Sequence, residues 1–207
     1  MKNNYLTLKY LKLEAIIGLI MVLAGAIILA KYYWGVSLAI VATITLILSI
    51  ILKKLWNTKA FKWMFWVDDF SGEYRGKLRF KYIDEIGNVQ IGEREHVKCI
   101  VQDGSNLVIN SFTIREDGSK SSASVSKGVH VEHTSDGNHF LLIYNYLNDG
   151  SAEQGFPPHY GTEVVKFIKK GDEKVLSGGY YTNREPFQTR GEFIDLKRVS
   201  NNNGHAF

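Results

Sequence analysis

The sequence contains a single cysteine, Cys99, among 207 residues. One thiol cannot close an internal disulfide, so the chain has no disulfide framework and fits a reducing compartment. Cys99 lies in the run His96–Val101, which alternates in the manner of a β-strand. No second cysteine accompanies it, so we expect a buried structural thiol rather than a nucleophile.

The sequence also lacks the usual catalytic signatures. It has no G-x-x-x-x-G-K-[ST] loop, no H-E-x-x-H, no C-x-x-C and no G-x-S-x-G. The run His130-Val131-Glu132-His133 comes nearest to a metal-binding pattern. On a strand, however, residues 130 and 133 point to opposite faces. We therefore predict no catalytic residue, no metal site and a protein that is not an enzyme.

Acidic residues are scarce in the first third of the chain. Before Val67 there are eight Lys and one acid, Glu14, for a net charge of +7. From Val67 onward, 17 Lys and Arg stand against 20 Asp and Glu, for a net charge of −3. A surface for DNA or RNA needs clustered cations, so neither polymer is an expected partner of the second part.

Two long stretches contain no charged residue. Ala15–Ala30 and Val36–Leu52 are almost entirely apolar, and only Lys31–Gly35 separates them. With their flanks they approach the ~20 residues that span a bilayer, and this pattern predicts two transmembrane helices in a tight hairpin. A signal peptide is the alternative for the first stretch, but no A-x-A cleavage pattern follows it. Neither stretch has an ionisable residue at its centre, which argues against a proton relay or transporter.

The lysines predict the orientation of this hairpin. Three Lys precede the first span, one lies between the spans and four follow the second. The positive-inside rule then places both termini in the cytoplasm and the chain in the bacterial inner membrane as a multi-pass protein. All four Trp lie at positions 34, 56, 63 and 66. The aromatic residues between Trp56 and Trp66, interleaved with Lys59 and Lys62, predict an interfacial collar.

After Asp69 the pattern changes to a period of two. In Glu73–Tyr82, apolar and small residues alternate with charged ones, which predicts a half-buried strand. Seven further strands are predicted at about 96–102, 106–116, 120–131, 139–147, 161–169, 174–181 and 189–198. Turn signals such as Asp103-Gly104-Ser105 separate them.

The predicted fold is a membrane-anchored all-β protein, with a small antiparallel barrel of about eight strands after the two helices. A sandwich is the alternative. We expect a hairpin with its collar over residues 1–66, a cytoplasmic barrel over 67–200 and a disordered tail over 201–207. A barrel of this size is wide enough to hold one small ligand.

Polar and aromatic side chains gather between Gly178 and Gly191. Arg can bind phosphate in a fork, Thr and Asn can bond a base edge, and Tyr can stack on a base. The alternative is a polar hairpin in which Arg184 and Arg190 pair with Glu185 and Glu192. The predicted ligand-binding residues are Tyr180, Tyr181, Thr182, Asn183, Arg184 and Thr189, with Tyr144 and Tyr146 beside the loop Asn148–Tyr160 as a second location.

Two motifs resemble a known family. These are F-S-G-E-Y-R-G at 70–76 and L-S-G-G-Y-Y-T-N-R-E-P-F-Q-T-R-G-E-F-I-D-L-K-R at 176–198. With the apolar hairpin, they resemble the SMODS-associated two-transmembrane β-barrel effectors of CBASS operons, also called CD-NTase-associated effectors. The resemblance extends to about Val199.

The resemblance implies a receptor rather than a catalyst. A neighbouring CD-NTase would make a cyclic dinucleotide during phage infection, and the barrel would bind it without any other cofactor. The chain would then form a homo-oligomer whose hairpins disrupt the inner membrane and abort the infection. Two alternatives are a barrel that carries a lipid or other apolar molecule, which needs an apolar lumen, and a structural anchor, which needs a filled barrel.

Overall fold

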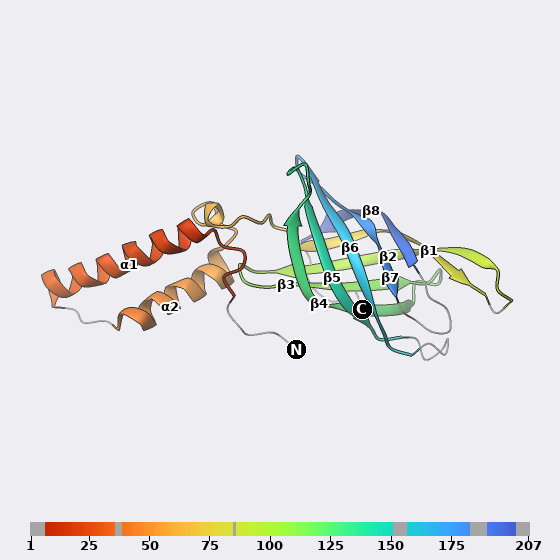
Figure 1. Ribbon diagram of the computed structural model, residues 1–207, viewed down its shortest axis with the longest axis horizontal. Coiled ribbons are helices and arrows are strands. Elements are labelled where there is room, and N and C mark those ends of the chain that lie inside the picture. The colour runs from red at the N-terminus through yellow and green to blue at the C-terminus, as the bar shows by residue number, and fades with distance from the viewer. Residues whose placement is uncertain (1–6, 36–38, 85, 151–156, 183–189, 202–207) are drawn as a thin grey trace. The chain divides into compact units, whose positions relative to one another are not determined.

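The computed structural model describes residues 7–35, 39–84, 86–150, 157–182 and 190–201 (Figure 1). The chain forms two compact units. The first comprises Met1–Asp69 and Gln102–Asn106, and the second comprises Phe70–Val101 and Leu107–Phe207. The first unit is helical, and the second contains all the strands except the last residue of one of them.

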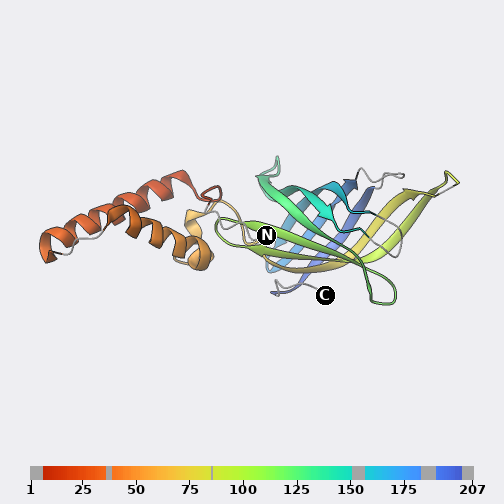
Figure 2. The same cartoon turned by 90° about the horizontal axis from the view of Figure 1, so that it is seen from below.

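The helical unit begins with α1 (Leu13–Trp34), which ends at Gly35 in the left-handed region that favours glycine. Beside it lies α2 (Ile40–Ile50), which continues into the π-helical turn η1 (Ile51–Leu55), and Figures 1 and 2 show the two helices next to each other. Among the described residues, α1 alone is long and apolar enough to cross a membrane. Its 22 residues span about 33 Å. The second predicted transmembrane helix is therefore not confirmed.

The segment predicted as an interfacial collar is partly a small core. Trp56 and Phe65 are buried, and their rings meet edge to face at 5.9 Å. The backbone N–H of Lys12 donates to the carbonyl of Met64 at 2.8 Å, next to the short 3₁₀ helix η2 (Lys62–Met64). Only Trp63 among these aromatic residues presents most of its side chain to the outside. The collar therefore anchors chain segments to one another and is not simply a membrane-facing surface.

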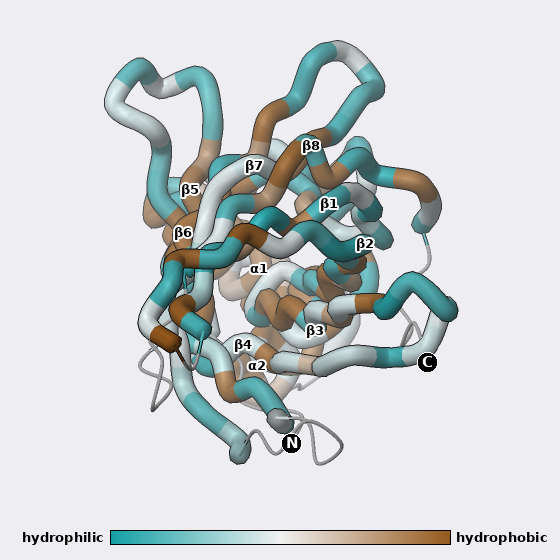
Figure 3. The backbone as a smooth tube through the Cα atoms, turned by 90° about the vertical axis from the view of Figure 1, so that its right-hand side faces the viewer, coloured by the Kyte–Doolittle hydropathy of each residue, from teal (hydrophilic) through white to brown (hydrophobic). Residues whose placement is uncertain are grey.

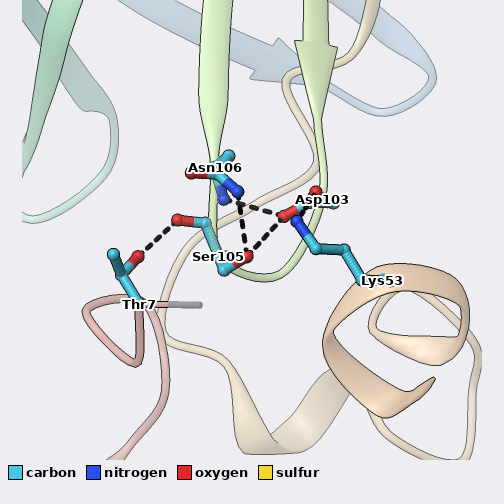
Figure 4. Close-up of polar contacts among 5 residues, drawn as sticks. All are labelled: Thr7, Lys53, Asp103, Ser105 and Asn106. Carbon is cyan, nitrogen blue, oxygen red and sulfur yellow. Dashed lines mark hydrogen bonds and ion pairs between the residues drawn. The ribbon is translucent and has the colours of Figure 1, made fainter. Parts of the chain in front are cut away.

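The turn Gln102–Asn106 packs in this same unit (Figure 4). Asp103 accepts hydrogen bonds from the backbone N–H groups of Ser105 and Asn106 and an ion pair from Lys53 at 2.9 Å. The Gly104 N–H donates to the carbonyl of Leu52, and a Cβ at position 104 would lie 2.9 Å from that oxygen. The sequence Asp-Gly thus forms a turn that fits against η1.

The second unit is a closed barrel of eight strands, each paired with its sequence neighbours and β1 with β8. The strands are β1 (Gly72–Ile83), β2 (Val89–Gln102), β3 (Leu107–Ile114), β4 (Lys120–His133), β5 (Phe140–Asn148), β6 (His159–Lys170), β7 (Glu173–Thr182) and β8 (Arg190–Ser200). Figure 3 shows them in a ring, and the predicted eight-stranded antiparallel barrel is confirmed. β2 begins earlier than predicted because Val89 continues the ladder opposite Ile83.

One end of the barrel is filled with apolar side chains. The register brings Phe140 opposite both His133 and Phe167, and the Phe70 ring meets those of Phe140 and Phe167 at 5.3 and 4.8 Å. Buried aliphatic residues complete this layer: Ile100, Leu107, Ile109, Val129, Val131, Leu142, Val165, Leu176 and Leu196. Burial of such side chains stabilises the fold and closes this end.

The β1–β2 hairpin extends beyond the other strands, as Figures 1 and 2 show. Its tip presents exposed apolar side chains: Ile83, Ile86, Val89 and Ile91. Exposed apolar residues that gather in this way are typical of interaction surfaces.

Candidate ligand-binding cavity

The opposite end of the barrel encloses a cavity of about 690 Å³. Small-molecule sites have volumes of ~300–1,000 Å³. The cavity residues come from all eight strands, at the level where β5 ends at Asn148 and β6 begins at His159. Because strand side chains alternate in direction, every second residue of these strands faces the interior.

Aromatic rings form one wall of the cavity. β7 and β8 contribute Tyr180 and Phe193, whose centroids are 5.9 Å apart, and β5 contributes Tyr146 at 6.4 Å from Tyr180. Phe80 continues this wall on β1, which neighbours β8 in the closed sheet. Such rings can stack on the flat faces of nucleobases.

Glycines opposite these rings make room for them. A Cβ at Gly161 would lie 2.3 Å from the Tyr146 side chain, and one at Gly92 would lie 2.4 Å from Phe80. In each case the glycine on the neighbouring strand has no side chain, and this leaves space for the aromatic ring beside its backbone.

Hydroxyl groups line another part of the wall. β3 contributes Ser111 and Thr113, and the start of β4 contributes Ser121, Ser122 and Ser124. Each hydroxyl can both donate and accept a hydrogen bond, which suits phosphate and ribose oxygens. On the adjacent strand β2, Arg94 adds a guanidinium, which matches phosphate geometry.

A buried ion pair forms the floor. The Lys98 Nζ lies 2.6 Å from the Glu163 Oε2 and donates to the Ser111 hydroxyl at 2.9 Å. The Tyr144 hydroxyl donates to the same carboxylate oxygen at 2.5 Å. Burial lowers the pKa of Lys98, and the charge of Glu163 opposes that effect. Burial, together with the Glu163 charge, raises the pKa of Tyr144 well above its usual range.

His96 lies next to this pair on β2. Its Nδ1 is 3.2 Å from the Thr113 hydroxyl, and its ring stacks on Phe193 at 5.0 Å. Burial, and then the charge of Lys98, lower the pKa of His96 well below its usual range. The imidazole is therefore neutral at physiological pH.

The structure brings some of the predicted ligand-binding residues together. Tyr146 and Tyr180 line the cavity, and Tyr144 lies behind the lining, where its hydroxyl donates to Glu163. Thr182 is buried at the end of β7 and donates to the carbonyl of Tyr160 at 3.0 Å. Tyr181, by contrast, is 56% exposed and is not part of the cavity wall.

Several predictions fall outside the described residues. These include Asn183, Arg184 and Thr189, the loop segment 151–156 and the tail positions 202–207. For these positions the sequence predictions stay predictions.

Sequence reasoning missed the serine wall, Arg94 and the buried group His96, Lys98 and Glu163. A signal for them was present. Lys98 stands two residues from Ile100, and Glu163 two residues from Val165, so both occupy the inward phase of apolar strands. A charged residue in that phase indicates a buried pair or a binding site.

The structure also describes the cysteine and the two histidines considered as reactive or metal-binding candidates, Cys99, His130 and His133. Cys99 is a buried free thiol, as predicted, and burial raises its pKa to about 11. His130 is exposed, whereas His133 packs against Phe140 with ring centroids 4.3 Å apart. Within the described ranges, no group of three or more His, Cys, Asp or Glu is placed to hold a metal ion.

The comparison with known proteins agrees with the resemblance drawn from the two motifs. Residues 67–198 match the family described as "Cap15, cyclic dinucleotide receptor domain". No curated protein and no solved structure matches the chain. The matched region contains β1 to β7 and all but the last two residues of β8, and it covers more than half of the sequence. The barrel is therefore a cyclic dinucleotide receptor domain, and the chain belongs to the Cap15 family of CBASS effectors.

Proposed function

We propose that this chain is an anti-phage effector whose barrel cavity binds a cyclic dinucleotide and whose membrane segments then assemble and disrupt the inner membrane. The observation that carries the proposal is the cavity itself, which combines aromatic and hydroxyl walls inside the domain that matches the receptor family. A cyclic dinucleotide has two bases that need flat partners and two phosphates that need hydrogen-bond donors.

The lining favours this ligand over the alternatives. A lipid carrier needs an apolar lumen, but Arg94, Glu163 and the serine wall make this cavity polar along much of its lining. A structural anchor needs a filled barrel, and this barrel has a cavity of about 690 Å³.

In the proposed site, Tyr146 and Tyr180 stack on the bases, while Arg94 and the serine wall bind phosphate and ribose. Thr182, Asn183, Arg184 and Thr189 belong to the same proposal, because they follow or flank the strand ends at this part of the cavity. Loss of a charge-assisted contact costs ~1.5–3 kcal/mol, so Arg184→Ala should weaken binding tenfold or more.

Membrane disruption requires several chains. One or two helices cannot enclose a pore, so any leak must come from hairpins acting together. Gly18 and Gly25 lie seven residues apart on α1, and apart from the helix's own backbone no described atom lies within 4 Å of the Cβ that each could carry. A separation of seven residues places both on one face of the helix, and small residues at a helix interface let a neighbouring helix approach closely. The exposed apolar tip of the β1–β2 hairpin offers a second contact surface.

Strand β2 connects the cavity to the turn that belongs to the helical unit, and this connection could couple ligand binding to assembly. β2 carries Arg94, His96 and Lys98, and it ends in the turn Gln102–Asn106, which packs with η1 in the helical unit. A ligand that moves β2 therefore acts on the turn that Lys53 and Thr7 hold. Such coupling requires different ligand affinity for the resting and assembled states.

The test uses full-length protein in liposomes loaded with dye. Cyclic dinucleotide should cause leakage and raise the amount of crosslinked oligomer, and Ile86→Lys should reduce both while leaving ligand affinity unchanged. Leakage from a monomer, or oligomers equally abundant with and without ligand, contradicts the gating. Reporter fusions at both termini test the orientation, and an active periplasmic phosphatase would overturn it.

A further inference from the structure

One buried polar atom beside the cavity has no hydrogen-bond partner. His96 is 4% exposed, and its Nε2 has no partner among the described residues. The other ring nitrogen is satisfied by Thr113 at 3.2 Å, and Phe193 holds the ring plane. An unpartnered buried polar atom costs free energy, so such atoms usually mark a ligand or water position.

The second feature is the carboxylate of Glu163, which also lines the cavity. Two donors, Lys98 and Tyr144, hold its Oε2, and this fixes the orientation of the group. A carboxylate can accept about four hydrogen bonds, so acceptor capacity is left over. It cannot donate any.

A neutral imidazole has one ring nitrogen that donates and one that accepts. If the Thr113 hydroxyl donates to Nδ1, then Nε2 carries the proton and can donate to a ligand group that reaches it. If it accepts from Nδ1, then Nε2 accepts. The floor of the cavity therefore offers a fixed acceptor at Glu163 and one adjustable group at His96.

We propose that Glu163 and His96 read the edge of one base of the ligand, and that this base carries an imino N–H, as guanine and uracil do. The inference rests on the proposed function and names its ligand class. Guanine N1–H and uracil N3–H can donate to the carboxylate. Adenine and cytosine present a bare ring nitrogen at the same place, which would meet the lone pairs of Glu163, so that only their exocyclic amino group remains as a donor to the carboxylate. A site built to bond an N–H rejects a base that lacks it by at least about tenfold.

Titration calorimetry of the full-length protein in detergent tests the base preference. The probes are cyclic di-GMP, cyclic di-UMP, cyclic di-AMP and cyclic di-CMP, which share one backbone. We expect cyclic di-GMP or cyclic di-UMP to bind at least about tenfold more tightly than the other two. If cyclic di-AMP or cyclic di-CMP binds as tightly, this inference is overturned while the proposed function stands. If none of the four binds, both are overturned.

Two substitutions test the role of His96. His96→Asn keeps a polar atom near the Nδ1 position for Thr113 but removes the one at Nε2, whereas His96→Gln keeps an amide near Nε2. We expect His96→Asn to reduce the affinity ratio between preferred and rejected ligands severalfold, and His96→Gln to preserve more of it. An unchanged ratio in folded His96→Asn, or equal loss of the ratio in both variants, shows that His96 only packs and overturns the proposal. If His96→Asn does not fold, the ratio in His96→Gln and the ligand panel on the unaltered chain decide.

Discussion

The Nζ of Lys98 lies 2.6 Å from the Glu163 Oε2, and neither side chain is more than 4% exposed. Removing one member of such a pair leaves a buried charge without a partner, which costs about 3–5 kcal/mol. Lys98→Met should therefore lower the free energy of unfolding strongly, and adding Glu163→Leu should restore much of it. Chemical denaturation measures both variants.

Lys77 provides a matched control for this prediction. Its Nζ is also 2.6 Å from a carboxylate, that of Glu93, but the two side chains are 66% and 38% exposed. Exposed ion pairs contribute about 0–1 kcal/mol, so Lys77→Met should change stability little. If Lys77→Met and Lys98→Met lower the free energy of unfolding equally, Lys98 does not form a buried ion pair.

His96 should make the stability of the domain depend on pH. Its pKa in the folded protein lies well below the ordinary value of 6.5 because of burial and the charge of Lys98. Below pH 6.5 the unfolded chain binds a proton there that the folded chain excludes, so the free energy of unfolding falls as the solution becomes more acidic. His96→Gln should show a shallower fall between pH 6.5 and 5 than the unaltered chain.

His130 is the control for that measurement, since its side chain is 68% exposed. His130→Gln should retain the slope of the unaltered chain. A slope that His96→Gln leaves unchanged would mean that the imidazole is protonated in the folded protein.

The space that Gly161 leaves for the Tyr146 ring should be sensitive to one added methyl group. A Cβ at Gly161 would lie 2.3 Å from the Tyr146 side chain, so Gly161→Ala should displace that ring within the cavity. Overpacking of this kind costs ~1–3 kcal/mol, and we expect a severalfold or greater loss of ligand affinity in calorimetry. Val164→Ala, on an exposed position of the same strand, should bind normally. Normal binding by Gly161→Ala would remove Tyr146 from the site.

Asp103 should contribute more to its turn than Lys53 does. Asp103 accepts hydrogen bonds from Ser105 and Asn106 as well as from Lys53 (Figure 4). Asp103→Ala should therefore speed amide exchange at Ser105 and Asn106 more than Lys53→Ala does. Equal exchange in the two variants would mean that the ion pair alone holds the turn.

The same turn should weaken in acid. Burial alone would raise the pKa of Asp103, but hydrogen bonds from Lys53, Ser105 and Asn106 together lower it below 3.8. Its contribution to stability is thus fully present above pH 3.8 and is lost as the pH falls through the lowered value. Amide exchange at the turn should accelerate in that range, and Asp103→Asn should remove this dependence.

The barrel could be predicted because strand alternation and turn residues are local signals. Tyr74, Leu78 and Phe80 share one face in the sequence pattern, and Leu78 and Phe80 line the cavity. The strand phase of Lys98 and of Glu163 indicates that each faces inward, but their pairing could not be predicted, because 65 residues separate them and only closure of the barrel brings them together. Tyr180 and Tyr181 were equivalent candidates by composition, and the phase of β7 distinguishes them.

In the helical unit, composition predicted an apolar helix but not the packing of the aromatic residues. The apolar stretch of α1 was evident from composition, whereas the burial of Trp56 and Phe65 depends on the distant turn at Gly104. A Cβ at Gly104 would lie 2.8 Å from the Phe65 ring. Interfacial position and core packing both favour aromatic residues, so composition alone did not separate the two.

The most direct test of the account is a thermal unfolding measurement of the full-length protein with a panel of cyclic dinucleotides, made in parallel on Ser124→Trp. Ser124 lies in the hydroxyl wall, so a Trp there fills the cavity while the apolar end of the barrel is untouched. At 100 times its dissociation constant, a bound ligand should stabilise the unaltered chain by about 2.7 kcal/mol, and Ser124→Trp should show no such gain. No stabilisation by any cyclic dinucleotide, or equal stabilisation of Ser124→Trp, would contradict binding in this cavity.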